Sequence, residues 1–128
     1  MRGQWMAAMI VVAGLSGHAR LGLAQTVDED QRIAAMAAEA ESAEQHARVA
    51  TEARARAEQL DAEAARYEKT ARRLEKNWFP NEYKTPSMLQ PGYRERQRAA
   101  NARHGARESR ALAKRHRQIA IDIRNAPE

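Results

Sequence analysis

The chain has 128 residues, a formal net charge of +5, no cysteine and an apolar fraction of 43%. Alanine supplies 28 of the apolar residues, and only 17 larger apolar side chains follow residue 24. Because alanine buries little area and a short chain buries a small share of its surface, a thick single-chain core is excluded. Six glycines, four prolines and the lack of long β-branched runs after residue 24 argue against sandwiches, barrels and doubly wound sheets. The composition predicts an all-α protein.

Residues 1–24 have the pattern of a secretory signal peptide, with a positive start and an apolar stretch. Small-x-Ala sites end at Ala19 and at Ala24. We expect cleavage after Ala24, and cleavage after Ala19 stays open. An uncleaved N-terminal membrane anchor is the alternative, which the polar residues His18 and Arg20 disfavour. We therefore expect an exported protein, located in the periplasm or outside the cell if the source is bacterial.

The exported part, residues 25–128, predicts one helical hairpin. The first helix is expected over about 28–77, where no proline or glycine interrupts, and the pattern Thr26–Glu29 fits a capping box at its start. Three prolines in residues 78–92 predict a turn, and the second helix is expected over about 93–125. Two long helices joined by so short a segment form an antiparallel hairpin.

Residues that are mostly alanine recur at spacings of 3 and 4 along both expected helices, and they form a seam like that of a coiled coil. In the first helix they are Ile33, Met36, Ala40, Ala43, Ala47, Ala50, Ala53, Ala57, Leu60, Ala64, Tyr67, Ala71, Leu74 and Trp78. In the second they are Ala99, Ala102, Ala106, Ser109, Ala113, His116, Ala120 and Ile123. The steps of 3 and 4 alternate except at Ala50–Ala53, where a second step of 3 follows the first. This extra step of 3 predicts a stammer. An alanine-rich seam of this kind lets two helices approach closely.

The two halves of the exported part differ in charge. Residues 25–77 hold 9 Lys and Arg against 12 Asp and Glu, whereas residues 78–128 hold 11 against 5. The favoured interpretation is that the two helices pair along their flanks and so set the antiparallel register. The alternative is a basic face for an anionic partner, with the side chains Arg103, Arg107, Arg110 and Lys114. Export excludes nucleic acid and leaves anionic lipid, a cell-wall polymer or an acidic protein.

The expected turn is rich in large side chains. With Tyr93 it holds four of the five aromatic residues that follow residue 24. Its candidate partner-binding residues are Trp78, Phe79, Tyr83, Met88, Leu89 and Tyr93. These side chains either cover the end of the hairpin, which alanines cannot do, or form a docking patch, since Trp, Tyr and Met are enriched at interface cores. Both interpretations stay open.

Catalytic and metal-binding patterns are not favoured by the sequence. The candidate metal ligands are His46, His104 and His116, but no two of them are three or four residues apart. If the hairpin folds near Thr85, we expect Tyr67 to face His104 and His116 to face Arg54. As a seam residue, His116 is then a polar device that sets register. No nucleophile elbow or phosphate loop is present, so we expect no enzyme and no cofactor.

A family resemblance rests on five stretches: His46-Ala47, Ala64–Tyr67, the proline-containing turn, Ala99-Ala100 and Ala111–Ala120. Over about residues 28–123 the chain resembles small exported bacterial alanine-rich helical-hairpin proteins of unknown function. The resemblance implies a hairpin and export, and no activity. The chain is also similar to Spy/CpxP-type periplasmic stress chaperones in being small, exported, helical and basic, although their Leu-Thr-x-x-Gln signature is absent.

Together these patterns predict a non-enzymatic structural or protein-binding module of the cell envelope. We expect it to self-associate or to bind an envelope protein, because its core is thin. One alternative is a periplasmic chaperone-like or metal-responsive stress protein. The other is a module that binds an anionic envelope surface through the arginine-rich second helix.

Overall fold

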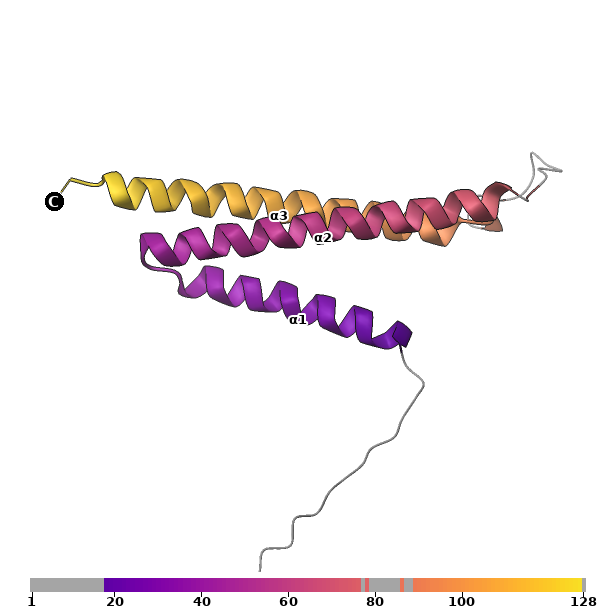
Figure 1. The fold of residues 1–128 in the computed structure, drawn as a ribbon, viewed down its shortest axis with the longest axis horizontal. Coiled ribbons are helices and arrows are strands. Elements are labelled where there is room, and N and C mark those ends of the chain that lie inside the picture. Colours follow the sequence, from indigo (N-terminus) through magenta and orange to yellow (C-terminus); the bar gives the residue numbers. More distant parts are fainter. Residues whose placement is uncertain (1–17, 77, 79–85, 87–88, 128) are drawn as a thin grey trace, which may run out of the picture.

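The structure, a computed structural model, describes residues 18–76, 78, 86 and 89–127, with side chains from residue 27 onward. It contains the helices α1 (His18–Glu39), α2 (Ala43–Lys76) and α3 (Tyr93–Asn125), and no strand occurs in these ranges (Figure 1). The prediction of an all-α fold is therefore confirmed. Most of the expected signal peptide, residues 1–17, lies outside the described residues.

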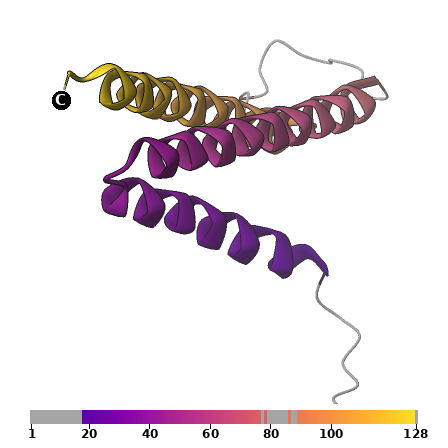
Figure 2. The same cartoon turned by 60° about the vertical axis from the view of Figure 1, so that its left-hand side comes forward.

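The predicted hairpin is formed by α2 and α3. The two helices lie side by side and antiparallel, and both views show them in contact along most of their length (Figures 1 and 2). The bounds of α3 agree with the expected range, and α2 ends at Lys76, one residue before the expected end. The end of α2 and the start of α3 follow from the prolines and the glycine in the segment between the two helices, because these residues destabilise a helix.

The first helix is not continuous, which corrects the expectation of one helix over 28–77. The chain leaves the helical conformation at residues 40–42. The Ser42 Oγ accepts the backbone N–H of Gln45 at 3.2 Å, and the Gln45 side-chain oxygen accepts the backbone N–H groups of Ser42 at 2.9 Å and Glu41 at 2.8 Å. This is a capping box, in which side chains bind the free N–H groups of a new helix. It makes Ser42 the N-cap of α2, which begins at Ala43.

The start of α1 also differs from the prediction. The helix begins at His18 and runs through Thr26, so Thr26 is not a cap in this chain. The residues that precede Thr26 are mostly leucine, alanine and glutamine, which continue a helix readily. None of the described helices has a segment long and apolar enough to cross a membrane.

Before the break, α1 lies along the first part of α2 and runs in the opposite direction (Figures 1 and 2). Ile33 of α1 is buried, and the Arg32 guanidinium lies 2.8 Å from the Glu52 carboxylate. Arg56 of α2 is buried and donates to both carboxylate oxygens of Asp30, at 2.7 and 3.2 Å. A buried cation is costly unless it is paired, so this bond holds α1 against the hairpin.

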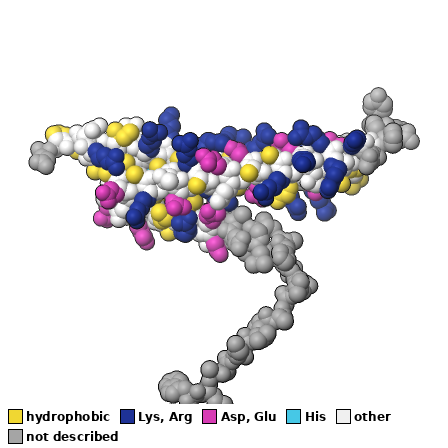
Figure 3. All heavy atoms as spheres, viewed as in Figure 1, with side chains coloured by type: hydrophobic (Ala, Val, Ile, Leu, Met, Phe, Trp, Pro, Cys, Tyr) yellow, Lys and Arg dark blue, Asp and Glu magenta, His cyan; other side chains and the backbone are white. Residues whose placement is uncertain are grey.

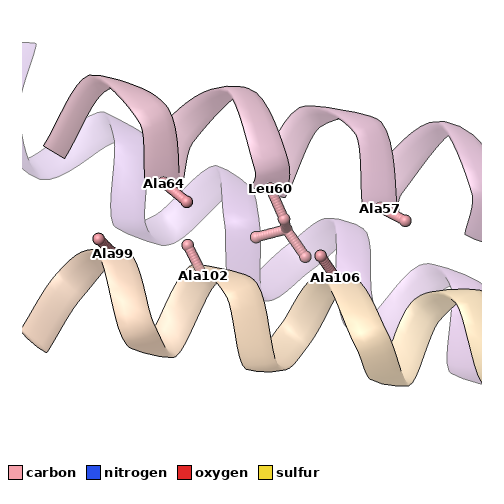
Figure 4. Close-up of a cluster of buried hydrophobic side chains, with 6 residues drawn as sticks. All are labelled: Ala57, Leu60, Ala64, Ala99, Ala102 and Ala106. Carbon is pink, nitrogen blue, oxygen red and sulfur yellow. The ribbon is translucent and has the colours of Figure 1, made fainter. Parts of the chain in front are cut away.

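The seam between α2 and α3 is lined by small side chains. Its central cluster has six buried residues, of which five are alanine: Ala57, Leu60, Ala64, Ala99, Ala102 and Ala106 (Figure 4). All six were expected at seam positions. Near the start of α2 the seam instead uses His46 and Val49, which are buried where Ala47 and Ala50 were expected, so the chain does not use the spacing that predicts a stammer. At the two ends, Leu74 and Ile123 are exposed.

The register of the hairpin differs from the expected one. A Cβ atom at Gly92, where φ is +83°, would lie 3.0 Å from the carbonyl oxygen of Ala71, and one at Gly105 would lie 3.1 Å from the Leu60 side chain. These two close approaches fix which residues face each other. In the seam, Ala71 lies against Gly92 and Leu60 lies against Gly105, rather than against the residues that a fold symmetric about Thr85 would place there. His116 contacts His46, Tyr67 lies under the Arg98 guanidinium, and His104 pairs with Glu108, so the expected pairings of Tyr67 with His104 and of His116 with Arg54 are wrong.

Leu60 is the single large side chain in the central cluster, and we expect Leu60→Ala to lower the free energy of unfolding by about 2–4 kcal/mol. The replacement leaves a cavity over Gly105 that two rigid helices cannot close. Leu74→Ala, at a position that is 41% exposed, is the matched control and should cost less than about 1 kcal/mol. Urea denaturation followed by circular dichroism measures both. Equal losses would contradict a core centred on Leu60.

Candidate functional site

Three ion pairs join α2 to α3 along one flank of the seam. They are Glu75–Arg96, Glu68–Arg103 and Asp61–Arg110. Successive pairs are seven residues apart on both helices, which is the spacing of flanking positions in a coiled coil. We call this set the ion-pair ladder. It agrees with the favoured interpretation of the charge difference between the two helices.

The ladder does not continue into the other half of the hairpin. Seven residues beyond Asp61 and Arg110 the corresponding positions are Arg54 and Arg117, which carry like charges. Both line an open groove of about 950 Å³ between α2 and α3. Like charges at facing flank positions destabilise a helix pair, so this part of the hairpin lacks the support that the ladder gives elsewhere.

The groove combines positive charge with a small-residue floor, and we call it the basic groove. Its charged residues are five cations, Arg54, Arg110, Lys114, Arg117 and Arg124, and one carboxylate, Glu58. Its alanines are Ala47, Ala50, Ala113 and Ala120. On the face drawn in Figure 3, Lys and Arg side chains follow the α3 edge, whereas Asp and Glu are more frequent over α1. The groove therefore presents an excess of positive charge.

Two histidines meet in the seam beside this groove. The Nδ1 atoms of His46 and His116 are 2.8 Å apart, and the ring centroids are 4.9 Å apart. The two residues are 8% and 6% exposed. In a neutral pair, one Nδ1–H donates to the unprotonated Nδ1 of the other ring. Protonation of the accepting Nδ1 would remove that bond and place a positive charge in the seam.

The surroundings of His116 oppose its protonation. Burial has the largest effect in lowering its pKa, and the adjacent His46 ring and the charge of Arg115 lower it further. A neutral His116 imidazole is therefore favoured in the folded protein near neutral pH. His116 is buried in the seam, as expected, and its partner there is His46; that it sets the register stays a prediction.

The structure divides the expected basic face into two kinds of residue. Arg103 and Arg110 belong to the ion-pair ladder, so their charges are compensated by α2. Arg107 and Lys114 make no ion pair with any carboxylate in the described part of the chain, and Lys114 lines the basic groove. His104 is exposed and pairs with Glu108 at 3.3 Å, apart from the two seam histidines.

Part of the expected aromatic patch falls on residues that are not described. Phe79, Tyr83 and Met88 lie outside the described residues. Trp78 is half-buried just after α2, and Leu89, at 69% exposed, projects from the chain before α3. Tyr93 is half-buried at the first residue of α3. The two interpretations of this segment, cover or docking patch, therefore stay predictions.

The sequence analysis missed Arg54, Arg117 and Arg124 as groove residues. A signal for them exists, because α3 has arginine at every seventh position from residue 96 to residue 124. The facing series on α2 is acidic for three steps and then changes to Arg54 and Ala47. The pairing of His46 with His116 could not be found in this way, since it depends on the register.

Within the described ranges, no group of three or more His, Cys, Asp or Glu side chains is placed to hold a metal ion. The seam pair offers two nitrogen atoms from His46 and His116. No family model, no curated protein and no solved structure matches the chain. The expected resemblances to bacterial hairpin proteins and to Spy/CpxP-type chaperones therefore stay predictions.

We expect the stability of the protein to fall as the pH drops below about 6.5, the ordinary pKa of histidine. The pKa of His116 is lowered in the folded state, so the unfolded chain binds this proton more readily. The stabilisation is complete above the unfolded pKa and is lost as the pH falls through the folded pKa. Urea denaturation at a series of pH values between about 7.5 and 5.5 measures the loss.

The double variant His46→Leu/His116→Leu removes the His116 ring together with its seam partner and should flatten this pH dependence. His104→Gln, at an exposed position, is the control and should keep the slope of the wild type. A double variant with the same slope as the wild type would show that other groups cause the pH dependence.

Proposed function

We propose that this protein is an exported, non-enzymatic binding module of the cell envelope, which acts by associating with another protein or with a second copy of itself. The single observation that carries the proposal is the composition of the seam, in which five of six central residues are alanine. Such a seam orders two long helices but leaves most of their surface free for contacts. The expectation of export rests on the pattern of residues 1–24.

A second candidate function is an anionic-surface binder that uses α3. The observation in its favour is that Lys114, Arg117 and Arg124 line the basic groove and make no ion pair within the described residues. A metal-responsive or chaperone-like role would have to use His46 and His116 or the segment before α3. The described residues give that role no observation beyond two adjacent imidazoles.

Export with cleavage after Ala24 predicts a processed chain that starts at Gln25 when the full-length protein is made in a bacterium. Ala24→Glu should block processing, because the residue before a signal cleavage site must be small. Ala19→Glu is the matched control and should still be processed after Ala24. Cell fractionation and N-terminal sequencing give the result. An unprocessed protein in the cytoplasm would contradict export, and a start at Arg20 would select the other site.

Association predicts a mass above that of one chain for the processed protein purified from the periplasm. Sedimentation equilibrium at micromolar concentrations measures this mass, and circular dichroism of the same samples reports helical content. We expect dilution to lower both, since a thin seam leaves apolar side chains such as Ile121 and Leu74 exposed in one chain. A monomer with full helical content at every concentration would contradict self-association.

A further inference from the structure

We propose that the basic groove binds an acidic amphipathic helix of a partner protein. The inference deepens the proposed function, on which it rests, by naming the surface and the chemistry of the partner. It is carried by three observations: the place where the ion-pair ladder stops, the shape and lining of the groove, and the way in which α1 packs on the same hairpin.

The first observation is uncompensated charge. Within the residues that the structure describes, Lys114, Arg117 and Arg124 make no ion pair. Arg54 pairs with Glu58 at 3.4 Å, but both side chains are more than two-thirds exposed, and such pairs contribute little. Cations therefore stand on both rims of the groove, Arg54 on α2 and the others on α3. A ligand with carboxylates along both of its edges would meet them.

The second observation is the floor between these rims. Ala47 and Ala50 of α2 and Ala113 and Ala120 of α3 line the groove, so a third backbone can approach closely. On α2 the groove extends from Ala47 to Glu58, a length of about 17 Å or three helical turns. A flat anionic surface would contact the cations at the rims but not the alanines between them. An anionic polymer without apolar groups would gain nothing from burying those alanines. A helix with small apolar residues on one face fills the groove.

The third observation is that the chain already binds one acidic helix on the other side of α2. There α1 places Ile33 in a buried position and directs Asp30 to the Arg56 guanidinium at 2.7 Å. On α2, Arg56 faces α1, whereas Arg54 and Glu58, each two residues away, line the groove. With 3.6 residues per turn, two residues lie on nearly opposite sides of a helix. The groove thus offers the same combination of cations and small residues, with no α1 residue among those that line it.

The groove next to the ladder shows what a compensated surface looks like. It measures about 410 Å³ and is lined by Glu68 and Glu75 together with Arg96 and Arg103, which are joined in ladder pairs. Four of its five charged residues are paired within the chain, and the fifth is Arg72. The basic groove is more than twice as large and has one carboxylate among five cations. Charge complementarity therefore favours an acidic partner at the basic groove over one at the groove next to the ladder.

The test measures binding of a labelled synthetic peptide of about 18 residues, with alanine and leucine at seam spacing and glutamate elsewhere. A scrambled peptide has the same composition without the apolar face. We expect the processed protein to bind the first peptide at least about tenfold more tightly than the second. The variant Arg117→Glu/Arg124→Glu should weaken binding of the first peptide by at least about tenfold, measured as Kd by fluorescence anisotropy.

The matched control is Arg94→Glu/Arg107→Glu, which changes the net charge by the same amount on the same helix but outside the groove. It should change the Kd less than about twofold, and circular dichroism should show both variants folded. Equal binding of the scrambled peptide, or equal loss in the control, would overturn the inference in favour of general anion binding. Binding to vesicles of phosphatidylglycerol without binding to the peptide would overturn it in favour of a membrane.

The groove could also be filled by a second copy of the chain, and the experiments distinguish this case from binding of a partner helix. If Arg117→Glu/Arg124→Glu converts an oligomer into a monomer, the groove is a self-association surface and the inference of a separate partner is overturned. If the wild type self-associates, the variant does so equally, and no peptide binds, the groove inference fails while the proposed function stands. Peptide binding by a strictly monomeric protein would support the inference and contradict self-association.

Discussion

The close contact of two alanine-lined helix faces determines the rest of this structure. Alanine side chains bring the backbones of α2 and α3 near enough for residues beside the seam to reach across it. At Gly92 and Gly105 even a Cβ atom would crowd the facing helix, so these two contacts set the register. The register in turn aligns carboxylates with arginines at steps of seven residues. Ion pairs, histidine contact and groove all follow from this alignment.

The two halves of the hairpin are held together in different ways. The half next to the connection has the ion-pair ladder and the Tyr67 ring, over which the Arg98 guanidinium lies 5.7 Å from the ring centre. The other half has no ladder pair in the described residues. It is supported by α1, through Arg56 and Ile33, and by the bond between the seam histidines. Support from α1 on one side leaves the opposite side open, and that side is the basic groove.

Composition was enough to predict the all-α class, the proline-containing segment 78–92 to predict where α3 begins, and the periodicity of small residues to predict the buried alanines of the central cluster. The break at residues 40–42 was missed because no proline or glycine marks it. Ser42 and Gln45 start a new helix by bonding to free backbone N–H groups, a local competition that apolar spacing does not report. The register was missed because it depends on the close contacts at Gly92 and Gly105, which apolar spacing does not report. The histidine pair and the groove depend on the register, so they were missed as well.

The interruption of the ladder at Arg54 and Arg117 lowers the free energy of unfolding of the isolated chain. A carboxylate at position 54 would extend the ladder by one pair with Arg117, worth about 0.2–1 kcal/mol for an exposed pair, whereas the arginine present repels Arg117. Solubility does not require this arrangement, since α2 and α3 carry exposed charges along their outer faces. Departures from locally favourable pairing concentrate at functional surfaces, where a ligand supplies the missing interaction. The facing arginines are accounted for when carboxylates from outside the chain occupy the position between them.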